Sequence, residues 1–150
     1  EMQENGVRVA VDEPAEPLMV RVDGELIQQA LLNLVLNAMQ AIGNGGTIEV
    51  RLRREHQSAV VEVADDGEGI PPEVLPRIFE LYFTTKPKGS GIGLAMTYRI
   101  LQLHGGTLDV RSNPDASAGA QGTVFTFRLP VAGGAAAGAG ASRKVMGERA

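Results

Sequence analysis

Apolar and polar side chains alternate in two neighbouring segments, and this alternation constrains the fold more than any other feature of the sequence. In residues 47–53, Ile48, Val50 and Leu52 alternate with polar residues, and residues 59–65 repeat the pattern after a short polar turn. A period of two is typical of a strand with one buried face. The two segments therefore predict a β-hairpin whose apolar face is covered by other parts of the chain.

Two helical patterns on either side of the hairpin can supply that cover. The first spans residues 25–42 and begins after Asp23, a favourable N-cap residue, and the second spans residues 91–104. This order of elements predicts an α+β fold, a two-layer α/β sandwich in which a mixed, mostly antiparallel sheet is covered on one face by helices. The other expected elements are a short helical piece at 73–79 and strands at 7–11, 18–22, 107–111 and 122–129.

Composition narrows the class of protein. The 150 residues carry a net charge of −4, which argues against a nucleic-acid-binding face, and no apolar run is long enough to cross a bilayer. The chain has no cysteine, which agrees with a reducing cytoplasm and excludes a thiolate metal site. We therefore expect a cytoplasmic domain that contacts neither nucleic acid nor membrane, cut from a parent protein that can be membrane-anchored.

The domain is expected to end before the chain does. Residues 1–130 contain all the predicted elements, whereas residues 131–150 are rich in Ala and Gly and have no pattern that could form a core. Such a composition predicts a flexible tail. Glu1 is not a natural start, so a longer protein is expected to precede it.

Four carboxamide side chains, Gln29, Asn33, Asn37 and Gln40, lie at helical spacing along the first predicted helix. Such a stripe can be a solvated helix face. Solvated faces usually carry Lys and Glu, however, and carboxamides can both donate and accept hydrogen bonds, as contacts to phosphates, a ribose or metal-bound water require. Both interpretations stay open on the pattern alone.

Asp65 ends the apolar side of the second hairpin strand, whereas Glu62 and Asp66 point the other way. An ionised carboxylate at the edge of a core needs hydrogen-bond donors, and a ligand with an N–H group can supply them. The alternative is that Asp65 caps a helix that starts at Pro71-Pro72. The alternation thus favours Asp65 over Asp66 as a ligand-binding residue.

Other polar groups fit the same kind of site. The glycine-rich turn at 89–94 opens the second predicted helix, where free N–H groups attract anions. In the last predicted strand, Thr123 shares a face with two phenylalanines. Either its hydroxyl lines the same pocket as Asp65, or threonine is present only because it is favourable in strands. His104, at the end of the second helix, stands where the helix dipole favours a cation.

Four segments, in this order along the chain, resemble the nucleotide-binding motifs of the family that unites gyrase, the ninety-kilodalton heat-shock chaperones, histidine kinases and mismatch-repair MutL. Residues 33–38 (NLVLNA) resemble the N box and residues 65–70 (DDGEGI) the G1 box. Residues 78–86 (IFELYFTTK) resemble the F box of histidine kinases and residues 89–94 (GSGIGL) the G2 box. The F box is most similar to that of sensor kinases of the nitrogen-regulation type, and the resemblance covers about residues 5–130.

The resemblance implies the Bergerat ATP-binding fold, with ATP and Mg²⁺ as cofactors. It implies that Asn37 coordinates Mg²⁺, that Asp65 accepts a hydrogen bond from the adenine amino group, and that Thr123 supports the same edge. Residues 71–90 would form a mobile lid over ATP. Lys86 in that lid would face the phosphates, so that Asn37 and Lys86 are the expected catalytic residues.

The resemblance also defines a full set of nucleotide-binding residues. Gln40 departs from the family pattern, because many histidine kinases carry a Lys or Arg there, and its role stays open. The expected set is Asn33, Asn37, Gln40, Asp65, Gly67, Gly69, Ile70, Phe83, Thr85, Lys86, Gly89, Ser90, Gly91, Ile92, Gly93, Leu94 and Thr123.

Asn33 separates the branches of this family. By resemblance, hydrolysing members and the anti-sigma serine kinases carry a Glu four residues before the metal-binding Asn, where it acts as a general base. Asn33 cannot take a proton at neutral pH, so a hydrolytic clamp or a serine kinase is disfavoured.

The predicted function is therefore that of the catalytic domain of a sensor histidine kinase in two-component signal transduction. Such a domain binds Mg-ATP and donates the γ-phosphate to a histidine on its own dimerisation and phosphoacceptor domain, which is expected before Glu1. A response regulator would be the downstream partner. The alternative is an ATP-sensing or degenerate module that binds the nucleotide without transferring phosphate.

Overall fold

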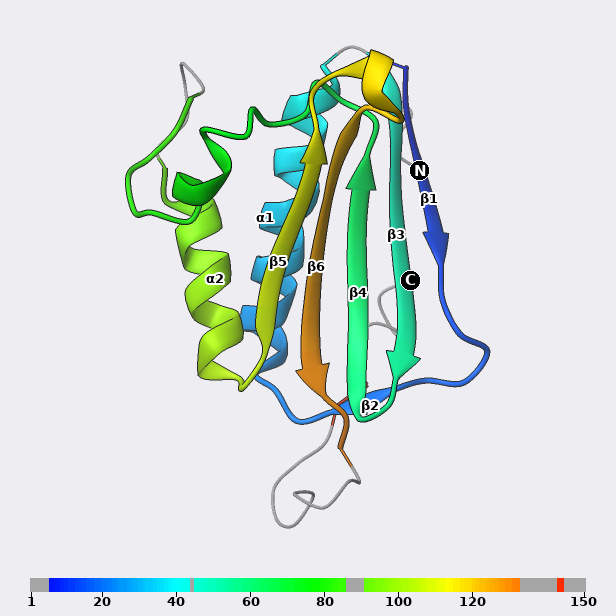
Figure 1. Ribbon diagram of the computed structural model, residues 1–150. Coiled ribbons are helices and arrows are strands. Elements are labelled where there is room, and N and C mark those ends of the chain that lie inside the picture. Colours follow the sequence, from blue (N-terminus) through cyan, green and yellow to red (C-terminus); the bar gives the residue numbers. More distant parts are fainter. Residues whose placement is uncertain (1–5, 44, 86–90, 133–142, 145–150) are drawn as a thin grey trace.

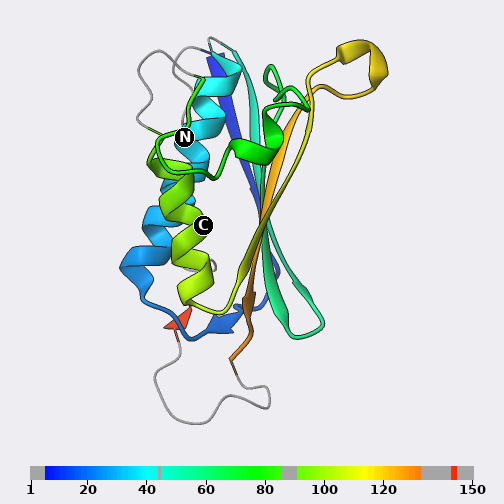
Figure 2. The ribbon, with the colours of Figure 1, turned by 60° about the vertical axis from the view of Figure 1, so that its left-hand side comes forward.

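The computed structural model describes residues 6–43, 45–85, 91–132 and 143–144. Figures 1 and 2 show two layers, a twisted sheet and two helices that lie against one of its faces. The main sheet has the strand order β1-β3-β4-β6-β5, in which β1 is parallel to β3 and the other neighbours are antiparallel. The predicted α+β sandwich with a mixed sheet is confirmed. The elements are β1 (Val7–Asp12), β2 (Met19–Val20), α1 (Gly24–Ile42), β3 (Gly46–Glu55), β4 (Ser58–Asp65), η2 (Leu75–Arg77), α2 (Gly93–Leu103), β5 (Thr107–Asn113), η3 (Ala116–Ala118), β6 (Gly122–Pro130) and β7 (Arg143–Lys144).

The hydrophobic core lies between the helices and the apolar face of the sheet. The buried residues of α1 recur every three or four positions, as one face of an amphipathic helix requires. On the sheet, alternate residues of β4 and β6 are buried against them, so the face predicted from the alternation is the covered one. The largest fully buried side chains of this core are Phe125, Phe127, Ile27, Leu34, Ile48, Leu101 and Leu129.

A two-residue turn closes the hairpin between β3 and β4. Glu55 pairs with Ser58, so that only His56 and Gln57 lie between the strands. His56 has a φ of 55°, in the left-handed region, whereas Gln57 has a negative φ. A positive φ at the first loop residue alone is typical of a type II′ turn, which prefers glycine at that position. The turn therefore holds His56 in a conformation that a residue with a Cβ adopts at a cost.

Two predicted elements differ from the structure. The strand predicted at 18–22 shortens to β2, which lies outside the main sheet and pairs with β7, because the chain crosses the end of the sheet here on its way to α1 (Figure 1). The helical piece predicted at 73–79 is a single 3₁₀ turn, Leu75–Arg77. Pro76 lies inside that turn and has no N–H to continue a helical ladder.

The two residues that follow β6 form backbone hydrogen bonds with other parts of the fold. The Val131 N–H donates to the carbonyl of Gln57 at 2.8 Å, and the Ala132 N–H donates to the carbonyl of Met19 at 2.7 Å. Apart from these two residues and β7, the predicted tail at 131–150 lies outside the described residues.

The beginning of α1 and the end of α2 are joined by His104. The Asp23 carboxylate caps α1 by accepting from the N–H groups of Glu25 and Leu26, at 3.0 and 3.3 Å. The Asp23 N–H donates to Nε2 of His104 at 3.1 Å, and Nδ1 of His104 lies 2.7 Å from the carbonyl of Ile100. Because a backbone N–H can only donate, Nε2 accepts and Nδ1 carries the proton. His104 thus links the beginning of α1 to the end of α2.

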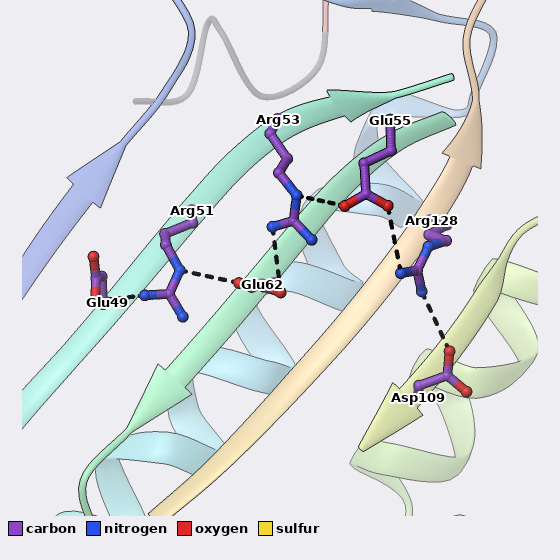
Figure 3. Close-up of polar contacts among 7 residues, drawn as sticks. All are labelled: Glu49, Arg51, Arg53, Glu55, Glu62, Asp109 and Arg128. Carbon is purple, nitrogen blue, oxygen red and sulfur yellow. Dashed lines mark hydrogen bonds and ion pairs between the residues drawn. The ribbon is translucent and has the colours of Figure 1, made fainter. Parts of the chain in front are cut away.

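Charged side chains cover the face of the sheet that the helices leave open (Figure 3). Glu62 of β4 lies at their centre, only 8% exposed, with one oxygen 3.0 Å from Nε of Arg51 and the other 3.3 Å from Arg53. Burial opposes the ionisation of Glu62, but the hydrogen bond from Arg51 and the positive charges of Arg53 and Arg51 outweigh it, so the pKa of Glu62 lies below its ordinary value. The chain of ion pairs continues through Glu49, Glu55, Arg128 and Asp109.

Candidate functional site

A cavity of about 590 Å³ opens between α1, the end of β4, the segment that follows β4, and the beginning of α2. Most of the residues predicted to bind a ligand meet there, although they come from distant parts of the sequence. Gly67 and Ile92 lie nearby without lining the cavity, and Lys86, Gly89 and Ser90 lie outside the described residues. The predicted residues that line it are Asn33, Asn37, Gln40, Asp65, Gly69, Ile70, Phe83, Thr85, Gly91, Gly93, Leu94 and Thr123.

Asp65 and Asp66 have different surroundings, and of the two only Asp65 lines the cavity. Asp65 is 8% exposed, lines the cavity, and accepts a hydrogen bond from the Gly67 N–H at 2.9 Å. Asp66 is exposed and accepts from the Thr47 N–H at 2.9 Å, which ties the end of β4 to the beginning of β3. The alternative role for Asp65, as a helix cap near Pro71, is wrong, because the 3₁₀ turn there begins at Val74 without a side-chain cap.

Gly67 allows the turn after Asp65 to pack on the end of α1. A Cβ at this position would overlap the backbone of Ala41, and the neighbouring Glu68 N–H donates to the Ala41 carbonyl at 3.3 Å. The turn is thereby fixed against the helix that carries Asn37. This contact places Asp65 and the carboxamides of α1 around one cavity.

Thr123 lies beside Asp65 on the neighbouring strand, at the paired position of β6, and is 3% exposed. Its hydroxyl is 2.7 Å from the hydroxyl of Ser112, which is the paired residue on β5. Ser112 also lies 2.7 Å from the N–H of Ile70 and 3.1 Å from the carbonyl of Gly122. Ser112 is not among the residues predicted from the sequence, because the predicted strand ends at residue 111, whereas β5 continues to Asn113. The signal was present, because Ser112 continues the alternate positions of Leu108 and Val110, which face the core.

Asn33 joins the two helices. Its side-chain N–H₂ group donates to the carbonyl of Gly93 and to the hydroxyl of Thr97, both at 3.2 Å, and its oxygen accepts from Gln29 at 3.1 Å. Thr97 is fully buried in α2. The carboxamide stripe is therefore no simple solvated face, although Gln29 and Gln40 are exposed.

The segment between η2 and α2 is held in place by aromatic contacts and by a backbone hydrogen bond. The Phe79 ring stacks on Tyr98 of α2 with centroids 5.3 Å apart, and the Arg77 guanidinium lies 4.4 Å from the centre of the Phe83 ring. The Tyr82 N–H donates to the carbonyl of Gly91 at 2.8 Å. Gly91 has a φ of 73°, and a Cβ there would overlap the backbone of Tyr82, so only glycine fits this close approach.

The donor set of the cavity suits a cation only together with an anionic ligand. In the described part of the chain, no group of three or more His, Asp, Glu or Cys side chains could hold a metal ion. Asn37 could supply one neutral oxygen ligand, so Mg²⁺ would take its other ligands from phosphate groups and water.

None of the described helices is long and apolar enough to cross a membrane.

Comparisons with known proteins agree with this geometry. The sequence profile of the histidine kinase-, DNA gyrase B-, and HSP90-like ATPase family matches residues 22–133. The sensor histidine kinase ZraS of Klebsiella oxytoca is 45% identical over 122 residues, which are 79% of this chain and 25% of ZraS. The chain thus spans about a quarter of the length of that relative.

Solved structures of histidine kinases share the fold. The mycobacterial sensor histidine kinase MprB superimposes with a TM-score of 0.74 at 33% identity, over 83% of this chain and 82% of that one. Full-length ShkA in complex with AMPPNP gives 0.70 at 27% identity, over 94% and 27% of the two chains. ThkA in complex with the response regulator protein TrrA gives 0.68 at 30% identity, over 83% and 34%.

The four motifs, the one-sided sheet and these matches lead to a single assignment. The chain belongs to the histidine kinase-, DNA gyrase B-, and HSP90-like ATPase family, as a catalytic ATPase domain of the sensor histidine kinase type.

Proposed function

We propose that this domain binds Mg-ATP in the cavity and donates the γ-phosphate to a histidine on a separate dimerisation and phosphoacceptor domain. The observation that carries the proposal is the position of Asp65, a carboxylate at the edge of the core that lines the cavity beside Thr123. The family description names ATPases, and the similar protein ShkA has been solved with AMPPNP. A cavity of about 590 Å³ is also within the usual range for a small-molecule site.

The adenine ring would occupy the end of the cavity at Asp65. A carboxylate only accepts hydrogen bonds, and the exocyclic amino group of adenine donates them. Ile70, Val74 and Ile78 line the same cavity and offer apolar contacts to the faces of the ring. This arrangement supports a preference for adenine over guanine, which carries an acceptor at the same position.

The phosphates would lie between Asn37 and the beginning of α2. The first turn of α2 contains no acidic residue, and its glycine, Gly93, lines the cavity. Free N–H groups at such a helix N-terminus favour an anion. Asn37 would hold Mg²⁺, which when bound neutralises phosphate charge, and we assign a similar neutralising role to Lys86.

The acceptor would be a histidine rather than water. Asn33 stands one turn before Asn37 and offers no carboxylate, and its N–H₂ group is engaged by Gly93 and Thr97. A histidine ring nitrogen attacks with its own lone pair, so that a nitrogen–phosphorus bond forms while the bond to the β–γ bridging oxygen breaks and ADP leaves. Such a reaction needs positioning and charge neutralisation more than a base on α1. The regulator bound to ThkA supports a response regulator as the downstream partner.

Phosphotransfer to a separately prepared histidine hairpin tests this proposal. With labelled ATP, the wild-type domain is expected to label the hairpin, and Asn37→Ala is expected to abolish labelling. Binding of ATP without any transfer would instead favour the ATP-sensing module. Rapid steady-state hydrolysis by the domain alone, lost in Asn33→Ala, would place the chain among the hydrolysing members and contradict the proposal.

A further inference from the structure

Ser112 takes part in three hydrogen bonds next to the residues that line the Asp65 end of the cavity. Its hydroxyl oxygen lies 2.7 Å from the backbone nitrogen of Ile70, 3.1 Å from the carbonyl oxygen of Gly122 and 2.7 Å from the hydroxyl of Thr123. Ile70 and Thr123 line the cavity, whereas Ser112 does not. Any effect of Ser112 on a ligand therefore passes through these two residues.

The chemistry of the partners favours one arrangement of the hydroxyl protons. A backbone N–H can only donate and a carbonyl can only accept, so Ser112 accepts from Ile70 and gives its single proton to Gly122. All three hydrogen bonds can then form at once only when Thr123 donates the one between the two hydroxyls. Ser112 is thereby fully used, with one donated and two accepted hydrogen bonds.

This proton arrangement determines what the cavity offers a ligand. The Thr123 proton points toward Ser112, so its oxygen presents lone pairs beside the carboxylate of Asp65, its partner across the strands. The Ile70 N–H also points toward Ser112 and is withdrawn from the cavity. Two potential donors are thus removed, and two acceptors are left side by side.

We propose that Ser112 is a positioning residue that sets the base specificity of this site, by making Thr123 an acceptor and occupying the Ile70 N–H. Two adjacent acceptors favour a purine with an amino group at position 6 and repel one with a carbonyl there. This inference rests on the proposed nucleotide-binding function. Ser112→Ala would free the Thr123 hydroxyl to rotate and donate, and would release the Ile70 N–H, so that a 6-oxo purine becomes acceptable.

Calorimetric titration with ATP and with inosine triphosphate, which differ at position 6, tests the proposal. Ser112→Ala is expected to lower the ATP-to-ITP affinity ratio by roughly tenfold, the equivalent of one hydrogen bond. Most of that change is expected as tighter ITP binding. Ser112→Thr, which keeps the hydroxyl, is expected to restore the wild-type ratio.

A purely structural role for Ser112 would lower both affinities, or the melting temperature, without moving the ratio, and that result would overturn the inference. If Ser112→Ala does not fold, Ser112→Cys carries the same test, because its thiol fills the space but is a weak hydrogen-bonding group. A wild-type domain that binds neither nucleotide would overturn the proposed function and this inference with it. Unchanged selectivity in a variant that still binds ATP would overturn the inference alone.

Discussion

Asp65 and Asp66 are neighbours in the sequence but have different contacts, because β4 ends between them. Asp65 lines the cavity, whereas Asp66 does not line it and accepts a hydrogen bond from the N–H of Thr47 at the beginning of β3. The two carboxylates are chemically identical and differ only in position. Substituting each in turn therefore separates ligand contact from local structure.

We expect Asp65→Ala to weaken ATP binding by roughly ten- to a hundredfold, since a hydrogen bond to a charged group contributes about 1.5–3 kcal/mol. Asp66→Ala, the matched control, is expected to lower thermal stability slightly and to leave the affinity nearly unchanged. Isothermal titration calorimetry of both variants measures this difference. Equal losses of affinity would show that the ligand does not lie at the Asp65 end of the cavity.

Asn33 and Thr97 are expected to be coupled in stability, because the Asn33 amide donates to the Thr97 hydroxyl across the two helices. Asn33→Ala and Thr97→Val should each lower the free energy of unfolding by about 1 kcal/mol. The double variant should lose less than the sum, by about 0.5 kcal/mol or more. Urea denaturation of the four proteins gives this cycle, with the exposed Gln29→Ala as a variant of smaller effect. Strictly additive losses would mean that the bond contributes nothing.

The helices and strands that follow from local periodicity could be predicted from the sequence. Pairings and hydrogen bonds between distant residues could not. The hairpin β3–β4 and the helix α1 follow from alternation and from a three-to-four-residue repeat, and both form as predicted. The pairing of β2 with β7 has no signal within residues 18–22. The roles of Ser112 and Asn33 likewise depend on partners 42 and 60 residues away in the chain. The direction of a side chain could be predicted, but its hydrogen-bond partner could not.

The ion pairs that cross β3, β4 and β6 predict how stability depends on pH. The pKa of Glu62 is lower in the folded protein than its ordinary value, so folding favours the carboxylate. Its contribution is complete at neutral pH, where the group is ionised in both states, and is lost as the pH falls below the ordinary carboxyl range through the folded pKa.

Glu62→Gln removes this titration and is expected to cost about 1–2 kcal/mol at neutral pH, because Arg51 and Arg53 lose their shared carboxylate. The difference in unfolding free energy between the two proteins should shrink as the pH falls through the lowered pKa of Glu62 in the folded protein. Asp109→Asn, at the exposed end of the chain of ion pairs, is the control with a smaller effect. A constant difference across the pH range would show that Glu62 acts only by packing.

For the whole molecule, the cavity is built from both layers, so that a ligand in it links the sheet to the helices. Binding to the folded state alone must raise stability by mass action. We expect Mg-ATP at about 100 times its dissociation constant to add roughly 2.7 kcal/mol to the free energy of unfolding. Differential scanning fluorimetry measures the shift, and Asp65→Ala should lose most of it at the same nucleotide concentration. An unchanged melting curve at millimolar Mg-ATP would contradict nucleotide binding.

The turn at His56 and Gln57 has a consequence for the order in which the chain folds. Its two residues close the β3–β4 pair over a much shorter loop than the one between β5 and β6, which pair from Asn113 and Gly122 outward. Short loops lose the least entropy on closure, so this hairpin is expected to be formed in the folding transition state. His56→Gly relieves the left-handed conformation, worth about 1 kcal/mol, and should therefore speed refolding with a φ-value above about 0.5. Val110→Ala in β5 should act mainly on the unfolding rate in the same stopped-flow experiment. If His56→Gly instead slowed only unfolding, the hairpin would be a late structure, and the fold would have to begin at the helices.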